Sequence, residues 1–536
     1  MAMNTNTSSK FDNITCKELI HSGSPALYQL NPKKENIGTL TKMTLGEKDP
    51  NKKNKTILLV GETGAGKSTL INALVNYTMG VEWEDNVWFQ IIKEKKKSQC
   101  ESQTSDVIVY EIFGFEDQTL PYSLTIIDTP GFGSTAGIEH DAIISQRLFD
   151  LFRSDNGVHE INAVGLVLTQ TECRLSDRLS YILNSVVSLF GKDMEKNIVA
   201  LITYSNGRTP KNALKALEDA NVKFATNEKN QPVHFLFDNC LNEDRTEDIE
   251  DLKHADKIVM KGMRQFLDFL EKTEPQKLET TVDVLNERIR LTACVQNLQE
   301  KIHLIDLKQN EIQQTQEALE KYEQEMKKNE EFTVEVDEPY REKEPIDGGM
   351  WWLVFFQGAV CCTVCEENCH YPGCTMAPSP SWCEVMKGGR CTVCTKKCPV
   401  SDHVKEDWRF VTKTRKVKKT LEDVKKKYKK NKADSEEKMS LLEFLQKEKE
   451  NLEANKTQLL DEAYEHVVKL EEIALKVVSL STYVHLDFLI KEMEKKKDAE
   501  KVKKLKQMSM KKDKGLLAGL QYLRNKLPNM PQIFQR

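Results

Sequence analysis

The sequence has no long hydrophobic run. Its longest apolar stretch, Met350–Phe356, is much shorter than the roughly 18 residues that a membrane-spanning helix requires. The first ten residues also lack the apolar core of a secretory signal, and residue 2 is not the glycine that N-myristoylation needs. We therefore expect a cytoplasmic protein, and structural disulfides are rare in that compartment.

Apolar residues are too few for a single compact globule. They make up 39% of the 536 residues, whereas charged residues make up 30%, and this balance favours one core-bearing domain joined to long exposed helices. The net charge of -5 gives no overall attraction to nucleic acid, so we expect no sequence-specific nucleic acid partner. The length predicts about two to four domains.

The most informative stretch follows an apolar run at Ile57–Val60, which we interpret as a buried strand. This stretch consists of Gly61, four further residues and then Gly66-Lys67-Ser68, which is the pattern of a phosphate-binding loop. The glycines let backbone N–H groups turn toward one anion, and Lys67 supplies a charge for the β- and γ-phosphates. The Ser68 hydroxyl is placed for Mg²⁺. The predicted nucleotide-binding residues here are Gly61, Glu62, Thr63, Gly64, Ala65, Gly66, Lys67, Ser68 and Thr69.

A second nucleotide motif, Asp-Thr-Pro-Gly, ends the apolar strand Leu124–Asp128. The Asp128 carboxylate can hold Mg²⁺, usually through water, and the Gly131 N–H can sense a γ-phosphate. Thr104 is the candidate switch threonine that closes on Mg²⁺, with Ser105 as the second choice. We thus predict Lys67, Thr104 and Gly131 as catalytic positions, and Ser68, Thr104 and Asp128 as the magnesium-binding residues.

Strand-like and helix-like segments alternate from residue 55 to about residue 275. This pattern predicts an α/β domain with a mostly parallel sheet and helices on both faces. Within residues 1–54, alternating residues at 27–30 and 40–45 predict a hairpin ahead of that domain. The expected strands are Ile57–Val60, Val107–Phe113, Leu124–Asp128, Ala163–Thr169, Ile198–Thr203 and Val233–Phe237, and the expected helices are Ser68–Met79, Glu139–Phe152, Asp177–Phe190, Lys211–Ala220 and Asp251–Glu271.

The pattern changes after Pro275. Apolar residues at three- and four-residue spacing predict a coiled coil over residues 276–345 and a weaker one over 404–480. Residues 346–403, the cysteine-rich segment, lie between them, and 481–536 form a basic, amphipathic tail. An antiparallel helical hairpin with the cysteine-rich segment at its tip fits this order. The alternative is two separate helices, each dimerising with a second chain.

The stretch Lys413–Lys432 holds many lysines and few acidic residues. It is either the solvated face of a helix or a patch for an anionic membrane surface. Its single aromatic residue, Tyr428, is too little for a platform on which nucleic acid bases stack.

Cysteine and histidine spacing in the cysteine-rich segment predicts zinc. The segment has two Cys-x2-Cys pairs, and a pair at this spacing can clamp an ion from a tight turn. Tetrahedral zinc needs four ligands, so ten candidates suffice for two ions. One pairing places Cys362, Cys365, Cys391 and Cys394 on one ion, with the second ion held by four of the others. Disulfides are the alternative, and we do not expect Cys361 to be a ligand. The candidate ligands are Cys362, Cys365, Cys369, His370, Cys374, Cys383, Cys391, Cys394, Cys398 and His403.

The nucleotide motifs resemble a group of GTPases that contains septins, immunity-associated (GIMAP-type) GTPases and the chloroplast Toc receptors. The resemblance rests on the phosphate loop, on Asp-Thr-Pro-Gly-Phe-Gly from Asp128, and on Leu-Phe-Gly-Lys-Asp-Met from Leu189. It covers roughly residues 56–270. It implies a P-loop GTPase domain that binds GTP or GDP with Mg²⁺ and forms dimers or oligomers. The cysteine-rich segment is not part of this resemblance, so the chain looks like a divergent branch.

Two positions depart from the wider GTPase pattern. Phe132 follows Asp-x-x-Gly where many GTPases carry a glutamine that orients water, so hydrolysis should be slow without a partner. Asn206 stands where the base-reading motif has an aspartate. Asp238 and Asn239, after the last predicted strand, are the other expected base-binding residues. We therefore expect a GTP-binding switch with slow, dimerisation-dependent hydrolysis; the alternative is a nucleotide-binding scaffold with little or no turnover.

Overall fold

The computed structural model divides the chain into two compact units. The first contains Met1–Leu285, Ile473–Val484 and Met508–Arg536, and the second contains Asn286–Glu472 and His485–Gln507. Within the part of the chain that is described, no helix is long and apolar enough to cross a bilayer. The described residues are 9–11, 14, 17–37, 40–93, 106–116, 119–133, 138–171, 175–240, 243–246, 248–328, 333–346, 358–374, 377–420, 441–510 and 517–522.

An eight-stranded sheet forms the centre of the first unit, in the order β12-β11-β10-β5-β8-β7-β4-β3. Neighbouring strands from β12 to β8 run parallel, whereas β7 is antiparallel to β8 and β3 is antiparallel to β4. The prediction of a mostly parallel sheet is thus confirmed. The strands are β3 (Lys33–Ile37), β4 (Leu40–Leu45), β5 (Asn54–Gly61), β7 (Ile108–Ile112), β8 (Ser123–Asp128), β10 (Ala163–Thr169), β11 (Ile198–Thr203) and β12 (His234–Leu236).

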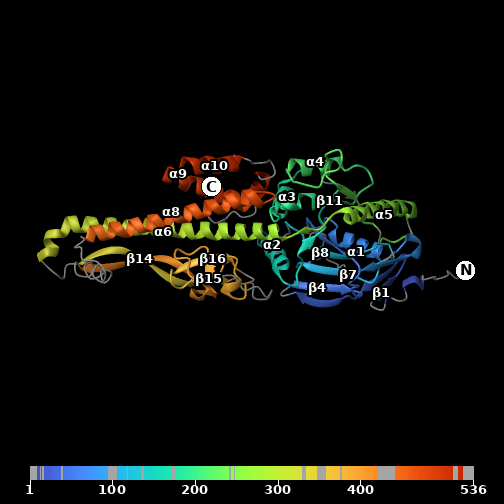
Figure 1. The fold of residues 1–536 in the computed structure, drawn as a ribbon, viewed down its shortest axis with the longest axis horizontal. Helices are drawn as coiled ribbons and strands as arrows, with labels where there is room; N and C mark the ends of the chain where they lie inside the picture. Colours follow the sequence, from blue (N-terminus) through green and yellow to red (C-terminus); the bar gives the residue numbers. More distant parts are fainter. Residues whose placement is uncertain are drawn as a thin grey trace. The chain divides into compact units, whose positions relative to one another are not determined.

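Both faces of this sheet are covered (Figure 1). In β5, Ile57 and Leu59 join the apolar cluster that includes residues of α1 and α5. Leu58 and Val60 point to the opposite face because side chains alternate along a strand, and they are fully buried as well. All five predicted helices are present, as α1 (Lys67–Thr78), α2 (Ile138–Arg153), α3 (Asp177–Val187), α4 (Lys211–Asp219) and α5 (Ile249–Lys272).

The predicted N-terminal hairpin is wrong in its pairing. β2 (Ala26–Leu30) lies in a separate sheet between β1 (Lys17–Ser22) and β6 (Val87–Gln90). β4 instead pairs with β3 and runs parallel to β7. Because alternation within a strand does not specify its partner, this distant pairing was hidden in the sequence. The proposed boundary at residue 54 therefore divides one sheet.

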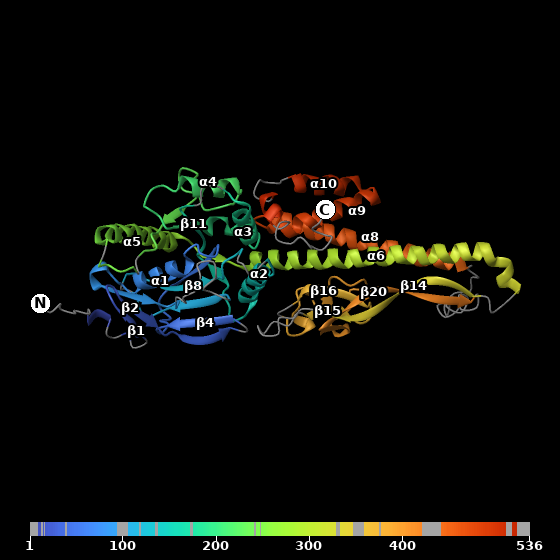
Figure 2. The same cartoon turned by 180° about the vertical axis from the view of Figure 1, so that it is seen from behind.

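Two long helices of the second unit run antiparallel. α6 (Glu279–Lys328) and α8 (Leu441–Ile473) contact each other where His466 Nδ1 lies 2.7 Å from Glu287 Oε2. A second contact joins Cys294 Sγ of α6 to Leu459 O of α8 at 3.6 Å. Cys294 comes seven residues after Glu287, whereas Leu459 comes seven residues before His466, so the two helices run in opposite directions. Figures 1 and 2 both show the two helices side by side. The antiparallel pair is confirmed, whereas coiled-coil supercoiling remains a prediction.

Two 13-residue strands, β14 (Thr333–Pro345) and β20 (Trp408–Thr420), replace the predicted ends of the two coiled coils. They pair antiparallel, and one strand is acidic where the other is basic. Arg415 lies 3.0 Å from Glu338, and Lys413 lies 2.9 Å from Glu342. The basic stretch is therefore neither a helix nor a free cationic patch as far as Thr420. Its remainder, residues 421–432, lies outside the described residues.

The cysteine-rich segment is built from short strands. β15 (Gly358–Cys362) pairs with β16 (Glu367–Cys374) and β19 (His403–Glu406), and β17 (Met386–Lys387) pairs with β18 (Arg390–Cys391). The same unit contains α9 (Leu480–Lys496) from residue 485 onward, and α10 (Ala499–Met510) as far as residue 507. The short strands of the first unit are β9 (Glu160–Ile161) and β13 (Gln276–Lys277), which pair with each other.

The cysteine-rich segment does not lie at the tip of the helical pair. Ala293 of α6 belongs to the same buried cluster as its cysteines, and Arg290 Nε donates to Glu384 O at 3.0 Å. Figure 2 shows β15 and β16 alongside α6. The prediction of a tip was wrong because β14 and β20 carry the chain back along the helix, as the 2.8 Å bond from Asp337 N to Gln314 Oε1 indicates.

One buried carboxylate joins α6 to the cysteine-rich segment. Glu367 is 2% exposed, and its Oε1 lies 2.5 Å from Nζ of Lys301, which is 6% exposed. Glu367 also accepts hydrogen bonds from Asn297 Nδ2 at 3.1 Å and from Thr395 N at 3.0 Å. A buried charge that is paired and fully bonded is tolerated, but removing one partner leaves the other charge uncompensated.

Glu367→Gln should therefore destabilise the second unit by about 3–5 kcal/mol, because the Lys301 ammonium loses its counter-charge. Hydrogen exchange of the α6 amides in increasing urea measures this free energy of unfolding. Glu366→Gln is the matched control, since Glu366 is exposed, and it should leave exchange unchanged. Equal exchange in the two variants would contradict the role given to Glu367.

Candidate functional site

Sheet topology brings the nucleotide motifs to one edge. β12, β11, β10, β5 and β8 are parallel neighbours, so their carboxyl ends meet, and ligands of open α/β sheets bind at such an edge. The phosphate loop follows β5, and Asp128 ends β8. Gln170, Asn206 and Asn239 come shortly after β10, β11 and β12. Most of the predicted nucleotide residues therefore face a common region.

The phosphate loop has the backbone conformation that its glycines allow. Gly64 and Gly66 have φ values of 84° and 86°, a left-handed region that side chains other than glycine rarely adopt. A Cβ added to Gly66 would lie 2.0 Å from Asn239 Nδ2. Helix α1 begins directly afterwards at Lys67, so its N–H groups and positive dipole end point into the loop.

Lys67 lies inside the loop. Its side chain is 7% exposed, and Nζ donates to Gly61 O and Glu62 O, both at 3.0 Å. Burial lowers the pKa of Lys67 to about 8, although the carboxylates of Asp128 and Glu62 raise it. An anion that binds in the loop would stabilise the protonated amine.

The Asp-Thr-Pro-Gly motif contacts the phosphate loop directly. Thr63 Oγ1 donates to Gly131 O at 3.3 Å, and a Cβ on Gly131 would lie 2.2 Å from the same Thr63 oxygen. Only glycine allows this approach. Phe132 N donates to Gly61 O at 3.1 Å, and the Phe132 ring is fully buried. Asp128 is fully buried at the end of β8.

The loops after β11 and β12 are tied to the phosphate loop. Thr203 Oγ1 donates to Ala65 O at 2.7 Å, and Asn239 Nδ2 donates to Gly66 O at 3.3 Å. Asn206 is exposed. Its Oδ1 accepts a 2.7 Å hydrogen bond from Gln170 Nε2 and a 3.1 Å bond from its own turn. Asp238 follows β12 and is half-buried.

Sequence reasoning missed two neighbours of this site. Gln170 positions Asn206, and Arg178 NH1 of α3 lies 2.8 Å from Glu62 Oε1 in the phosphate loop. No sequence signal identifies either one, because each contact joins segments that are far apart in the chain. Thr104 and Ser105, the switch candidates, lie outside the described residues.

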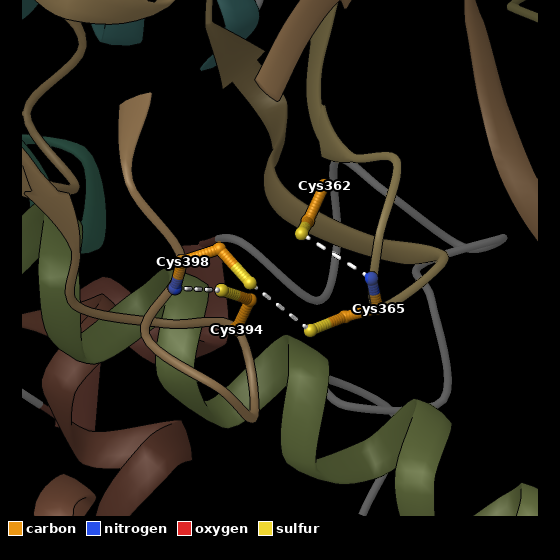
Figure 3. Close-up of side chains that lie close together, drawn as sticks. All are labelled: Cys362, Cys365, Cys394 and Cys398. Atoms are coloured by element: carbon orange, nitrogen blue, oxygen red, sulfur yellow. Dashed lines mark hydrogen bonds between the residues drawn. The ribbon is translucent and has the colours of Figure 1, made fainter. Parts of the chain in front are cut away.

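The zinc candidates form a second site. All ten predicted ligands fall into groups whose ligand atoms lie within 4.8 Å of one another, and nine of the ten are buried. Figure 3 shows the group whose sulfurs come from the turn after β15 and from the turn near Cys398. The three groups are Cys362, Cys365, Cys394 and Cys398; Cys369, Cys391, Cys394 and His403; and His370, Cys374 and Cys383.

The predicted zinc pairing is wrong. Cys398 takes the place that Cys391 was predicted to have beside Cys362, Cys365 and Cys394. Cys391 and Cys394 also group with Cys369 and His403. Cysteine spacing alone does not show this, because the turn after Cys394 folds back and brings Cys398 N to 3.2 Å from Cys394 Sγ. Cys361 lies in none of the groups, as predicted.

Comparisons with known proteins agree with the nucleotide motifs. Residues 51–145 match the Septin family model. Septin-1 of Drosophila melanogaster is 28% identical over 114 residues, which are 20% of this chain and 29% of that protein. The chain therefore spans less than a third of the length of this relative.

Two solved structures are also similar. One is Toc33 from Arabidopsis thaliana in complex with Mg²⁺ and GMPPNP, at 14% identity and a TM-score of 0.28, covering 42% of this chain and 88% of that one. The other is Era in complex with MgGDPNP and 16S ribosomal RNA nucleotides, at 14% identity and a TM-score of 0.26, covering 45% and 68%. The segment matched by the family model contains both the phosphate loop and the Asp-Thr-Pro-Gly motif, so the match supports a septin-like P-loop GTPase domain.

Proposed function

We propose that this protein is a cytoplasmic GTP-binding switch that hydrolyses GTP slowly in a dimer and uses a zinc-containing second unit for assembly or effector binding. The observation that carries the proposal is the phosphate loop itself. Its glycines, its buried Lys67 and the start of α1 converge on one region. In this role Lys67 would contact the β- and γ-phosphates, and Ser68 and Asp128 would hold Mg²⁺.

Slow hydrolysis is proposed from the position of Phe132. A buried phenyl ring cannot orient or polarise an attacking water, so the residue after Asp-x-x-Gly makes no catalytic contribution here. A second subunit would then supply the missing group. This supports turnover that depends on a dimer formed through the nucleotide faces.

Communication with the rest of the chain is proposed to run through α3. Near its start, Arg178 pairs with Glu62 of the phosphate loop. Beyond its end, Phe190 O accepts a 3.0 Å hydrogen bond from Leu475 N, in the segment directly after α8. A shift of the phosphate loop on nucleotide binding would therefore reach the segment at Leu475 through α3 and the residues that follow it.

Zinc is proposed to hold the cysteine-rich segment together. Its strands have only two to eight residues, and the buried cluster consists mainly of cysteines. Such a small apolar core is a weak source of stability, so the metal would contribute folding free energy directly.

The runner-up is a nucleotide-binding scaffold with little or no turnover. The buried Phe132 and the replacement of the base-reading aspartate by Asn206 favour it. Both proposals require nucleotide binding, and they differ only in whether the γ-phosphate is removed.

A turnover assay over a range of protein concentrations tests the proposed switch. The rate of GTP hydrolysis per molecule should be low and should rise as the concentration increases, because the dimer supplies the missing group. Lys67→Ala is the control and should show no turnover. Bound nucleotide without turnover at any concentration would favour the scaffold, and fast turnover that is independent of concentration would contradict both proposals.

Nucleotide affinity should depend on pH through Lys67. Its pKa of about 8 means that the amine is charged below pH 8 and loses its proton above it. Phosphate binding favours the charged form, so GTP affinity should be constant below about pH 8 and fall by up to about tenfold per unit above it. Calorimetric titration between pH 7 and 9 measures this.

Lys67→Arg is the matched variant, because its guanidinium stays charged throughout this range and its affinity should not change with pH. Lys67→Ala should abolish binding. If Lys67→Ala binds GTP as the wild type does, the assignment of the phosphate loop is wrong.

Asn206→Asp should tighten GTP binding and weaken binding of XTP. The usual aspartate accepts two charge-assisted hydrogen bonds from guanine, and one lost bond costs about 1.5–3 kcal/mol, or about 10- to 150-fold in affinity. The Asn206 Oδ1 is also engaged by Gln170. Competition binding of GTP, XTP and ATP measures the change, with Asn230→Asp, in another exposed loop, as control. An unchanged ratio of GTP to XTP would show that Asn206 does not face the base.

A further inference from the structure

We propose that the cysteine-rich segment holds three zinc ions and that the Cys394 thiolate bridges two of them. The inference deepens the proposed function and rests on it, because zinc is the metal assumed there. It concerns how many ions bind and how the ligands are shared.

The number of ligands requires a shared thiolate. Two of the three groups contain four members each, but Cys394 belongs to both. Together these two groups therefore offer seven side chains, whereas two separate tetrahedral zinc ions need eight. If Cys394 Sγ bridges the ions, each ion gains four protein ligands. Each would then be a closed, structural type of site.

Sulfur separations in the first group fit metal ligation. Thiolates bound to one zinc ion at about 2.3 Å and at tetrahedral angles lie about 3.8 Å apart. Cys365 Sγ and Cys398 Sγ are 3.7 Å apart (Figure 3). A disulfide needs about 2.05 Å, and these cysteines are free thiols. The geometry therefore favours a shared ion over a covalent bond.

Backbone N–H groups point at the sulfurs that would carry charge. Cys365 N lies 3.3 Å from Cys362 Sγ, and Cys398 N lies 3.2 Å from Cys394 Sγ (Figure 3). Cys394 N likewise lies 3.3 Å from Cys391 Sγ. Such bonds stabilise metal-bound thiolates and fix their direction. Two of these bonds come from the tight turns of the two Cys-x2-Cys pairs, and the third comes from the turn between Cys394 and Cys398.

His403 is oriented as a ligand of the second ion. It is 5% exposed, and its Nδ1 lies 2.9 Å from Pro399 O. That bond places the proton on Nδ1 and leaves Nε2 with its lone pair, as in most metal-ligating histidines. Nε2 is buried and has no hydrogen-bond partner among the residues that the structure describes. A zinc ion shared with Cys369, Cys391 and Cys394 would satisfy it.

The third group is separate from the bridged pair. His370 Nδ1 lies 3.2 Å from Cys383 Sγ, and the sulfurs of Cys374 and Cys383 are 3.9 Å apart. The separation again matches two thiolates on one zinc ion. Buried Glu384 has Oε2 3.5 Å from the same histidine nitrogen, but it is not a member of the group, so three protein side chains would hold this ion and water would take the fourth position.

Elemental analysis and cadmium NMR of the full chain test this proposal. The purified protein should contain three zinc ions per chain. After exchange into ¹¹³Cd, two resonances should split each other through the bridging sulfur, and the third should be unsplit. This experiment needs no variant, so it does not depend on whether a mutant folds.

Three serine variants locate the bridge. Cys394→Ser should remove two ions and the splitting, whereas Cys383→Ser should remove one ion and keep the splitting. Cys361→Ser is the matched control, because Cys361 is buried beside Cys362 but belongs to no group, and it should keep all three ions.

Two outcomes would overturn the proposal while leaving zinc binding intact. They are two ions per chain, and cadmium signals without mutual splitting. The absence of zinc altogether would instead contradict the zinc-containing second unit of the proposed function, so the two failures are distinguishable.

Discussion

The nucleotide site depends on parallel pairing of neighbouring strands. Because β12, β11, β10, β5 and β8 run in the same direction, their carboxyl ends lie together and the loops that follow can bond to one another. Thr203, Phe132 and Asn239 each bond to a backbone carbonyl of the phosphate loop or of the glycine that begins it. A loop fixed at three places keeps its N–H groups preorganised for phosphate, which lowers the entropic cost of binding.

The second unit is stabilised in a different way. Its cysteine-rich segment is attached to α6 by Glu367, Lys301 and Asn297, and its own core is made largely of potential metal ligands. A buried ion pair adds specificity only when its bonds are satisfied. The carboxylate network therefore fixes where the segment lies on α6, and the proposed zinc ions would fix its internal fold.

The features that depend on short stretches of sequence were predicted most accurately. The phosphate loop, Asp128–Gly131 and the strands of the sheet follow from local spacing. Contacts between distant segments were not predictable. Arg415 of β20 pairs with Glu338 of β14, which lies 77 residues earlier, and Gln170 meets Asn206 only because β10 and β11 are neighbours in the sheet. The candidate ligands of the cysteine-rich segment were predicted as a set, but Cys398 rather than Cys391 joins Cys362, Cys365 and Cys394, which cysteine spacing alone does not reveal.

The most direct test of the central claim is to identify the nucleotide that the protein selects. The purified chain is incubated with equal amounts of Mg²⁺–GTP and Mg²⁺–ATP, freed of unbound ligand and denatured, and the released nucleotide is measured by chromatography. The account predicts guanine nucleotide, GTP or GDP, at about one per chain. Release of adenine nucleotide, or of none, would contradict it.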